Sequence, residues 1–184
     1  SGNIRVLCLE IVPLCSSIRS ALSKTALECL TSIASSFGAE MTPFFEGIVN
    51  SLLTILLSSK GFITRLASEC ISTIIRSVSR KKAFDYLTAD HKKRPGSCKA
   101  ALAMCLELLV DEIDGGDEII RDVVSVELVR AIGSFITDAN PEARKFARGA
   151  VKKLAKKNSE LAAAVANMQI DESEKKVILD AIAK

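Results

Sequence analysis

Apolar residues recur at three- and four-residue intervals along most of the chain, and four short loops with basic residues in or just beyond them interrupt this pattern. The loops are Ser16–Arg19, Ser58–Phe62, Asp90–Ser97 and Asp138–Pro141. They are about 33 to 47 residues apart, and each joins two predicted helices. A helix with one broad apolar face must be covered by neighbours, so the chain is constrained to stack helical pairs on one another.

The repeat length is typical of HEAT-type (armadillo-like) helical hairpins. We therefore predict an all-α fold, an α-solenoid of about four to five such hairpins. No segment alternates with a period of two, so no strands are predicted. Because no low-complexity linker divides the 184 residues, we expect residues 1–184 to form a single domain.

The predicted helices have recognisable ends. Gly38 is predicted to end the second helix, and Thr42-Pro43 and Asn140-Pro141 are predicted to begin the third and the eighth. Asp171 and Glu174 have the spacing of a capping box for the last helix. The expected helices cover about residues 4–15, 20–37, 43–57, 63–78, 83–89, 97–113, 117–137, 141–157, 159–167 and 172–183.

The first and fifth helices have unusual surroundings. The first is apolar nearly all round, which fits either a buried helix or one whose neighbour is missing, and Pro13 lies near its end. A basic turn, Arg80–Lys82, is expected to lead into the short fifth helix.

Charge is distributed unevenly between the two ends of the predicted hairpins. If the helices alternate in direction, the four basic loops share one edge, where the N-termini of the even-numbered helices add positive potential. The basic residues expected on or next to this edge are Arg19, Lys60, Lys92, Lys93, Arg94, Lys99, Arg144 and Lys145. The opposite edge carries an acidic stretch, Asp111–Glu118. The basic edge is therefore predicted to face an acidic partner.

The six cysteines lie among apolar helical positions, without C-x-x-C or Cys/His spacing. We interpret them as buried, reduced thiols that act as small hydrophobic residues, which indicates a reducing, intracellular compartment. They are Cys8, Cys15, Cys29, Cys70, Cys98 and Cys105.

Motifs for catalysis, cofactors and metals are missing from the sequence. His91 is the only histidine and has no Cys, Asp or Glu at ligand spacing. The chain has no nucleophile elbow, phosphate-binding glycine loop or HExxH motif, so no enzyme activity, cofactor or metal is predicted. No signal peptide or membrane span is expected, and the net charge of +3 is too small to indicate nucleic-acid binding by itself.

Several stretches resemble a TOG domain of the CLASP/crescerin class, the tubulin-binding HEAT arrays of microtubule regulators. Ile18-Arg19-Ser20, followed by Thr25-Ala26-x-x-Cys29-Leu30, is similar to the first loop and helix of that class. Phe44–Leu57 and the Ser58-Ser59-Lys60 loop resemble its next helix and loop. The resemblance continues in Asp138-Ala139-Asn140-Pro141-Glu142-Ala143-Arg144 and in the capped tail helix after Asp171.

The resemblance implies a tubulin-binding domain of a larger, multidomain microtubule regulator. Its location would be the cytoplasm and cytoskeleton, at ciliary or spindle microtubules. TOG domains usually have six paired repeats, so the resemblance also implies that an N-terminal repeat has no counterpart here. The residues that would contact tubulin are Arg19, Ser59, Lys60, Phe62, Lys92, Lys93, Arg94, Asn140 and Arg144.

Other interpretations remain for these residues. Phe62 is more often a core residue than an interface residue, and an exposed loop lysine such as Lys60 is solvated by default. Arg144 is interpreted as mainly structural, with Asp138 or Asp90 as its partner. The basic face of the eighth helix is interpreted as a solvated outer surface; its residues are Arg148, Lys152, Lys153, Lys156 and Lys157.

Two other functions compete with tubulin binding. A HEAT-repeat scaffold could bind another acidic protein through the same edge. Nucleic-acid binding would use the Arg80–Lys82 and Lys92–Lys99 clusters, but these point to opposite edges and only Tyr86 offers a stacking ring beside them. No nucleic acid and no membrane are therefore predicted as partners.

Overall fold

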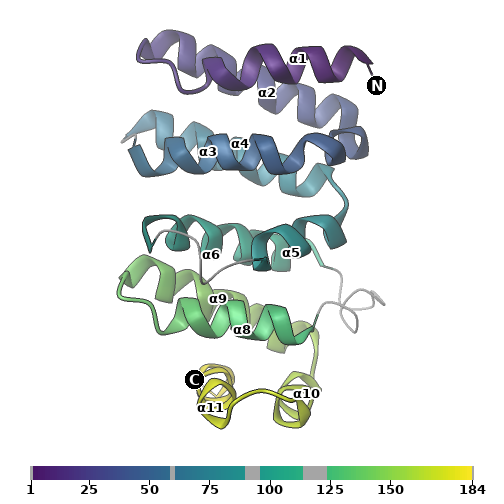
Figure 1. Cartoon of the computed structure of the whole chain (residues 1–184), viewed down its shortest axis with the longest axis vertical. Coiled ribbons are helices and arrows are strands. Elements are labelled where there is room, and N and C mark those ends of the chain that lie inside the picture. The colour runs from purple at the N-terminus through teal and green to yellow at the C-terminus, as the bar shows by residue number, and fades with distance from the viewer. Residues whose placement is uncertain (1, 59–60, 90–95, 114–123, 184) are drawn as a thin grey trace. The chain divides into compact units, whose positions relative to one another are not determined.

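The computed structural model describes residues 2–58, 61–89, 96–113 and 124–183, which are mainly helical and contain no β-strand. The chain forms two compact units, unit 1 (Ser1–Ala83) and unit 2 (Phe84–Lys184) (Figure 1). No helix in the described ranges is long and apolar enough to cross a membrane.

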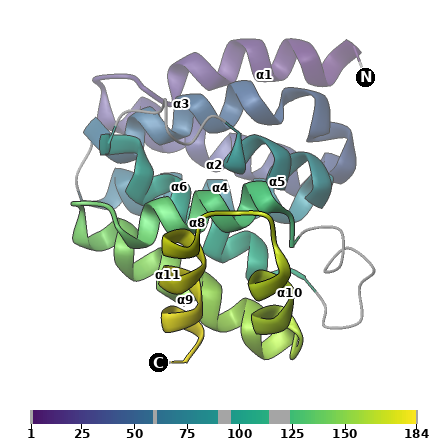
Figure 2. The ribbon, with the colours of Figure 1, turned by 60° about the horizontal axis from the view of Figure 1, so that its bottom comes forward.

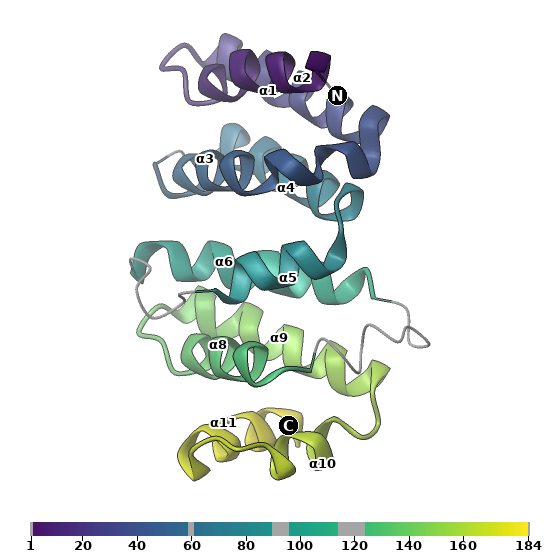
Figure 3. The same cartoon turned by 45° about the vertical axis from the view of Figure 1, so that its right-hand side comes forward.

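Unit 1 consists of two helical hairpins stacked in two layers. The first hairpin is α1 (Gly2–Leu14) and α2 (Ser20–Phe37), and the second is α3 (Phe45–Ser58) and α4 (Phe62–Ser77). The most extensive packing is between α2 and α4, while α1 contacts α2 and α3 (Figures 1 and 3). The core side of α2 is formed by six buried residues: Ser23, Ala26, Leu27, Leu30, Ile33 and Ala34.

The end of α2 follows the sequence prediction, whereas the start of α3 does not. Gly38 adopts a φ of 53°, a conformation that favours glycine, and its N–H donates to the Ala34 carbonyl. Thr42 and Pro43 do not cap α3, because they lie within a 3₁₀ helix, η1 (Gly38–Phe44). The Thr42 hydroxyl instead accepts a hydrogen bond from the Ser79 N–H at 3.1 Å. A tertiary contact therefore replaces the predicted local cap.

The first helix is not buried all round within the described chain. Ile4 and Cys8 face the core, and Pro13 lies inside the helix as expected. Val6 and Leu9 are 59% and 63% exposed. The sequence allowed either a fully buried first helix or one whose neighbour is missing. Within the described part of the chain, the interpretation as a fully buried helix is wrong.

Unit 2 contains two further hairpins and a terminal helical pair. Its elements are α5 (Arg80–Thr88), α6 (Gly96–Asp111), α8 (Val126–Ile136), α9 (Pro141–Lys157), α10 (Leu161–Asn167) and α11 (Glu172–Ile182). The boundary between the units falls inside α5, and the predicted basic turn, Arg80–Lys82, is in fact the first turn of that helix. The most extensive packing is between α6 and α9, and α11 lies against α8 and α9 (Figure 2).

Two predicted helix starts in unit 2 need correction. The sequence predicts one helix from about residue 117 to 137, but Val124 and Ser125 are not helical, and α8 begins at Val126, where the Ser125 hydroxyl caps it by accepting the Leu128 N–H at 3.2 Å. Asp171 and Glu174 do not form a capping box. Asp171 makes no side-chain cap bond, and Glu174 forms an ion pair with Arg130 of α8 at 3.5 Å.

Two lysines of α9 fasten this helix to α6. Lys153 forms ion pairs with Glu107, at 3.0 Å, and with Asp111. The Lys157 ammonium donates to the carbonyls of Val110, Asp111 and Ile113 at 2.6–2.8 Å. The end of α6 and the residues just beyond it thereby receive a positive charge and three hydrogen bonds. The interpretation of Lys153 and Lys157 as solvated surface residues is wrong.

The cysteines largely follow the prediction, with one exception. Cys8, Cys15, Cys70 and Cys105 are buried free thiols. Cys29 is also free but exposed, because it lies on a side of α2 that no described helix covers. Leu22, seven residues earlier on the same side of α2, is 39% exposed. The side chain of Cys98 lies outside the described residues.

Replacing Lys157 by methionine should destabilise the protein by about 1–3 kcal/mol, because three carbonyls, two of them half-buried, lose a charged donor. Urea unfolding followed by circular dichroism measures this change. Lys156→Met is the matched control, since Lys156 is exposed and makes none of these bonds. Equal destabilisation by both variants would contradict a stabilising role of the Lys157 hydrogen bonds.

Candidate functional site

Two loops of unit 1 lie side by side at the same end of its hairpins (Figure 1). One is the α1–α2 loop, and the other leads into α4 at Gly61. A groove of about 430 Å³ separates them; its lining includes Ser16, Ser17, Ile18, Thr54, Ile55 and Phe62. The proximity predicted for the first two loops is therefore present in unit 1.

Internal hydrogen bonds hold the α1–α2 loop in place. The hydroxyl of Ser23, which is 2% exposed, donates to the Cys15 carbonyl at 2.6 Å. The Arg19 N–H donates to the Ser17 hydroxyl at 3.2 Å. At the facing loop, Gly61 has a φ of 75°, which a residue with a side chain rarely adopts. The α1–α2 loop thus has a defined backbone next to the groove.

The rim of this groove exposes apolar and basic side chains together. Ile18 is fully exposed and Phe62 is 46% exposed. Arg19 is also exposed, as predicted. The contact residues predicted from the sequence did not include Ile18, and no sequence signal separates an exposed apolar loop residue from one that folds inwards.

The N-termini of α2 and α4 open at this end without side-chain caps. Arg19 and Gly61 occupy the cap positions, and neither makes a capping hydrogen bond. Neither helix has an acidic residue in its first turn. No side chain at Arg19 or Gly61 accepts from the first backbone N–H groups of these helices, and the helix dipoles add positive potential there.

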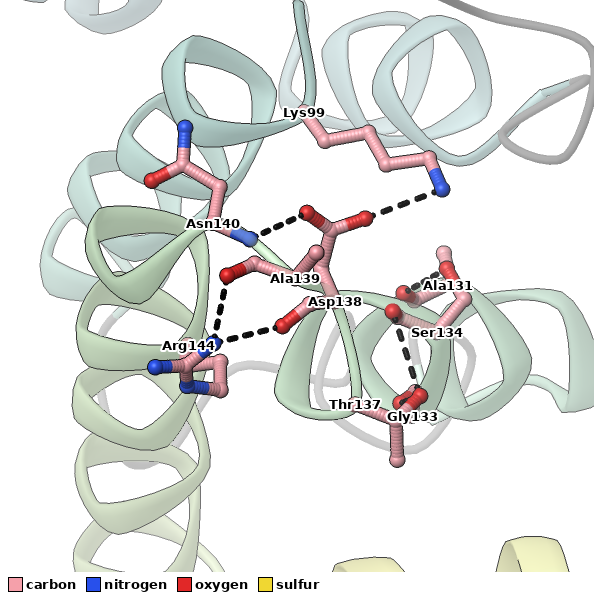
Figure 4. Close-up of polar contacts among 9 residues, drawn as sticks. All are labelled: Lys99, Ala131, Gly133, Ser134, Thr137, Asp138, Ala139, Asn140 and Arg144. Carbon is pink, nitrogen blue, oxygen red and sulfur yellow. Dashed lines mark hydrogen bonds and ion pairs between the residues drawn. The ribbon is translucent and has the colours of Figure 1, made fainter. Parts of the chain in front are cut away.

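In unit 2, two of the basic residues expected on this edge, Lys99 and Arg144, have internal partners (Figure 4). Lys99, in the first turns of α6, forms an ion pair with Asp138 at 3.0 Å. The Arg144 guanidinium donates to the carbonyls of Asp138 and Ala139 at 2.8 and 2.7 Å. The Asn140 side chain caps α9 by accepting the Glu142 N–H at 2.9 Å, as predicted.

Arg144 therefore has a structural role, as interpreted, but its hydrogen-bond partners are backbone carbonyls of its own loop rather than a carboxylate. Asp138 is largely buried. Burial alone would raise its pKa, but the Asn140 N–H, the Lys99 ammonium and the Arg144 charge together lower the pKa below its usual value.

Five of the residues predicted to contact tubulin lie outside the residues that the structure describes. They are Ser59, Lys60, Lys92, Lys93 and Arg94, and His91 also lies outside the described residues.

The buried cysteines are unreactive. Burial raises the pKa of Cys15 and Cys105 to about 12 and that of Cys70 to about 11, so these thiols stay protonated. Within the described ranges, no group of three His, Cys, Asp or Glu side chains could hold a metal ion.

Comparison with known proteins gives one family and one informative fold. The model of the CLASP N-terminal family matches residues 2–178. The structure is similar to one described as "Crescerin uses a TOG domain array to regulate microtubules in the primary cilium", with a TM-score of 0.71 and 13% identity over 100% of this chain and 74% of that chain. The predicted fold class, an all-α solenoid of HEAT-type hairpins, is confirmed.

Weaker structural matches are artificial helical-repeat or engineered proteins. A designed armadillo repeat protein is 15% identical over 98% of this chain and 86% of its own, with a TM-score of 0.42. An engineered protein is 21% identical over 99% of this chain and 47% of its own, with a TM-score of 0.47. A comparison with curated proteins gives no match.

Replacing Asp138 by asparagine should destabilise the protein by about 1–3 kcal/mol at neutral pH, because Lys99 loses its charged partner. The pKa of Asp138 is lower in the folded state than the unfolded value of about 3.9, so the carboxylate stabilises the fold above that value. This stability is lost as the pH falls through the lower, folded-state pKa. Urea unfolding at pH values from 7 into the acid range measures the difference in free energy of unfolding between the original protein and the variant. A difference that does not change with pH would refute the stabilising role of the Asp138 carboxylate.

Proposed function

Because the chain belongs to the CLASP N-terminal family, we propose that it is a TOG-like domain that binds tubulin and contributes to the regulation of microtubules. The fold likeness to a crescerin TOG domain supports the architecture this requires. We further propose that residues 1–184 act as one domain of a larger protein at the cytoskeleton, including ciliary or spindle microtubules, without catalysing a reaction.

The observation that carries this proposal is the composition of the loop surface of unit 1. Two adjacent loops expose Ile18, Arg19 and Phe62 beside two uncapped helix N-termini. A surface that offers cations and the positive ends of two helix dipoles favours carboxylates, and tubulin is strongly acidic, as the family resemblance implies. The exposed apolar side chains of Ile18 and Phe62 add hydrophobic contacts to this charge attraction.

The other proposed contact residues divide into two groups. Ser59 and Lys60 precede Gly61, and Lys92, Lys93 and Arg94 precede α6, so all five belong to the basic loops named from the sequence. Asn140 and Arg144 hold the backbone of the α8–α9 loop through the bonds described above. Their contribution to binding would come from positioning this loop as well as from contact.

Reversing charge at Arg19 and Lys60 together should weaken tubulin binding by roughly five- to tenfold, since each exposed contact is worth about 0.2–1 kcal/mol and repulsion replaces it. Gel filtration and sedimentation with tubulin at low salt measure binding. The control, Arg5→Glu with Lys176→Glu, changes the charge equally on exposed helical positions. Adding Lys93→Glu to the loop variant should weaken binding further.

Equal losses in the loop variant and the control would mean that net charge, rather than the loop surface, attracts tubulin. If the unaltered domain does not bind tubulin at low salt, the tubulin proposal fails, and a HEAT-repeat scaffold for another acidic protein takes its place.

Replacing Ile18 by serine should leave the unfolding midpoint unchanged, because this side chain is fully exposed and contributes no buried area. Tubulin binding should fall roughly three- to tenfold if Ile18 enters the interface, since burying an apolar side chain of this size there contributes about 1 kcal/mol. The same binding and unfolding measurements separate the two effects. A variant that unfolds earlier, or that binds as well as the original, would contradict this role of Ile18.

A further inference from the structure

A row of cations follows one exposed side of α9 in unit 2. Arg148, Lys152 and Lys156 are separated by four residues each, so they lie one above another along the helix. All three are exposed. Lys145, three residues before Arg148, extends the row towards the start of α9 and is 70% exposed.

These cations differ from the other lysines of α9 in lacking acidic partners. Lys153 and Lys157 are bound to α6, and Lys145 lies 3.8 Å from Glu142. Among the described residues, Arg148, Lys152 and Lys156 form no ion pair. Like charges four residues apart destabilise a helix. The row is therefore unfavourable for α9 by itself, and a partner that neutralises it would remove this repulsion.

A groove runs beside the row, between α9 and α11. Its volume is about 450 Å³, and its lining residues are Ile136, Thr137, Arg148, Lys152, Val177, Asp180 and Ala181. Ile136 and Ala181 are buried, and Val177 is half-buried, so these three side chains give the groove an apolar wall. In Figure 2, α9 and α11 lie side by side, in agreement with their contacts.

We propose that the α9–α11 groove is a second binding site, which takes an acidic peptide segment with one apolar anchor residue from a protein partner. The glutamate or aspartate side chains of the segment pair with Arg148 and Lys152, and the anchor enters the groove against Ile136, Val177 and Ala181. Pairing with the row also relieves the repulsion along α9. This site is separate from the loop surface of unit 1 and does not depend on tubulin binding.

The chemistry of the lining selects a peptide over other polyanions. The apolar wall has no partner in a ligand that carries only phosphates. No aromatic side chain lines the groove, so unpaired bases have no ring on which to stack. An apolar wall next to two cations instead matches a segment that alternates acidic and apolar side chains.

The test uses the whole chain and a fluorescein-labelled peptide of glutamates with one central phenylalanine, followed by fluorescence anisotropy at low salt. Arg148→Gln with Lys152→Gln should weaken binding roughly tenfold, because two ion pairs are lost. The matched control, Arg5→Gln with Lys24→Gln, removes the same charge from unit 1 and should leave binding unchanged. Thermal unfolding by circular dichroism verifies that both double variants are folded.

A second peptide, with serine in place of phenylalanine, tests the apolar wall without altering the protein. It should bind roughly three- to tenfold more weakly, since an apolar group no longer enters the groove. Equal affinity of the two peptides would reduce the site to non-specific charge attraction and overturn the proposal. It would also be overturned by equal losses in the two protein variants, by no binding of the phenylalanine peptide, or by tighter binding of single-stranded DNA or anionic lipid vesicles than of that peptide.

Discussion

Each unit depends on one interaction: the second helix of one hairpin packs against the second helix of the next hairpin. In unit 1 this contact joins α2 to α4, and in unit 2 it joins α6 to α9. Small buried residues allow the helices to approach closely; they include Ala34, Ala67, Ala103, Ala147 and Ala150. Because the paired helices run side by side, their connecting loops are brought to common ends. The loop surface of unit 1 is thus a consequence of core packing rather than of any attraction between the loops.

The same packing decides which cations hold the fold together and which face solvent. Lys153 and Lys157 reach α6 because they lie on the inner side of α9, whereas Lys152 and Lys156, one residue earlier in each case, lie on the outer side. Lys99 and Arg144 similarly complete the α8–α9 loop. Seven basic residues on α9 therefore serve different purposes, although they look alike in the sequence. Only the position of the neighbouring helix α6 determines which of these residues form internal bonds and which face solvent.

Local signals allowed much of the fold to be predicted from the sequence. The bounds of α2 and the Asn140-Pro141 start of α9 were predicted correctly, because glycine and asparagine satisfy helix ends through nearby backbone groups. Thr42 misled the prediction of the third helix, since its hydroxyl accepts a hydrogen bond from a residue 37 positions away. A cap signal in the sequence cannot reveal such a competing partner.

The prediction of the candidate site had a related limit. Arg19 was identified by its charge, but Ile18 was not, because an isolated apolar loop residue is indistinguishable in sequence from one that folds inwards. Cys29 shows the opposite error: it follows an apolar pattern, yet that side of α2 is exposed. Periodicity identifies which residues share a helix face, but not whether another element covers that face.

The exposure of Ile18 has a consequence for binding. The buried Ser23–Cys15 hydrogen bond and the Arg19–Ser17 bond already fix the backbone on both sides of Ile18. A loop held in this way loses little conformational entropy when a partner covers it, so more of the contact energy appears as affinity. An isoleucine on a mobile loop would have to be ordered first. The internal polar bonds of the α1–α2 loop thus favour the contact proposed for Ile18, and the uncapped end of α2 beside it is the polar part of the same surface.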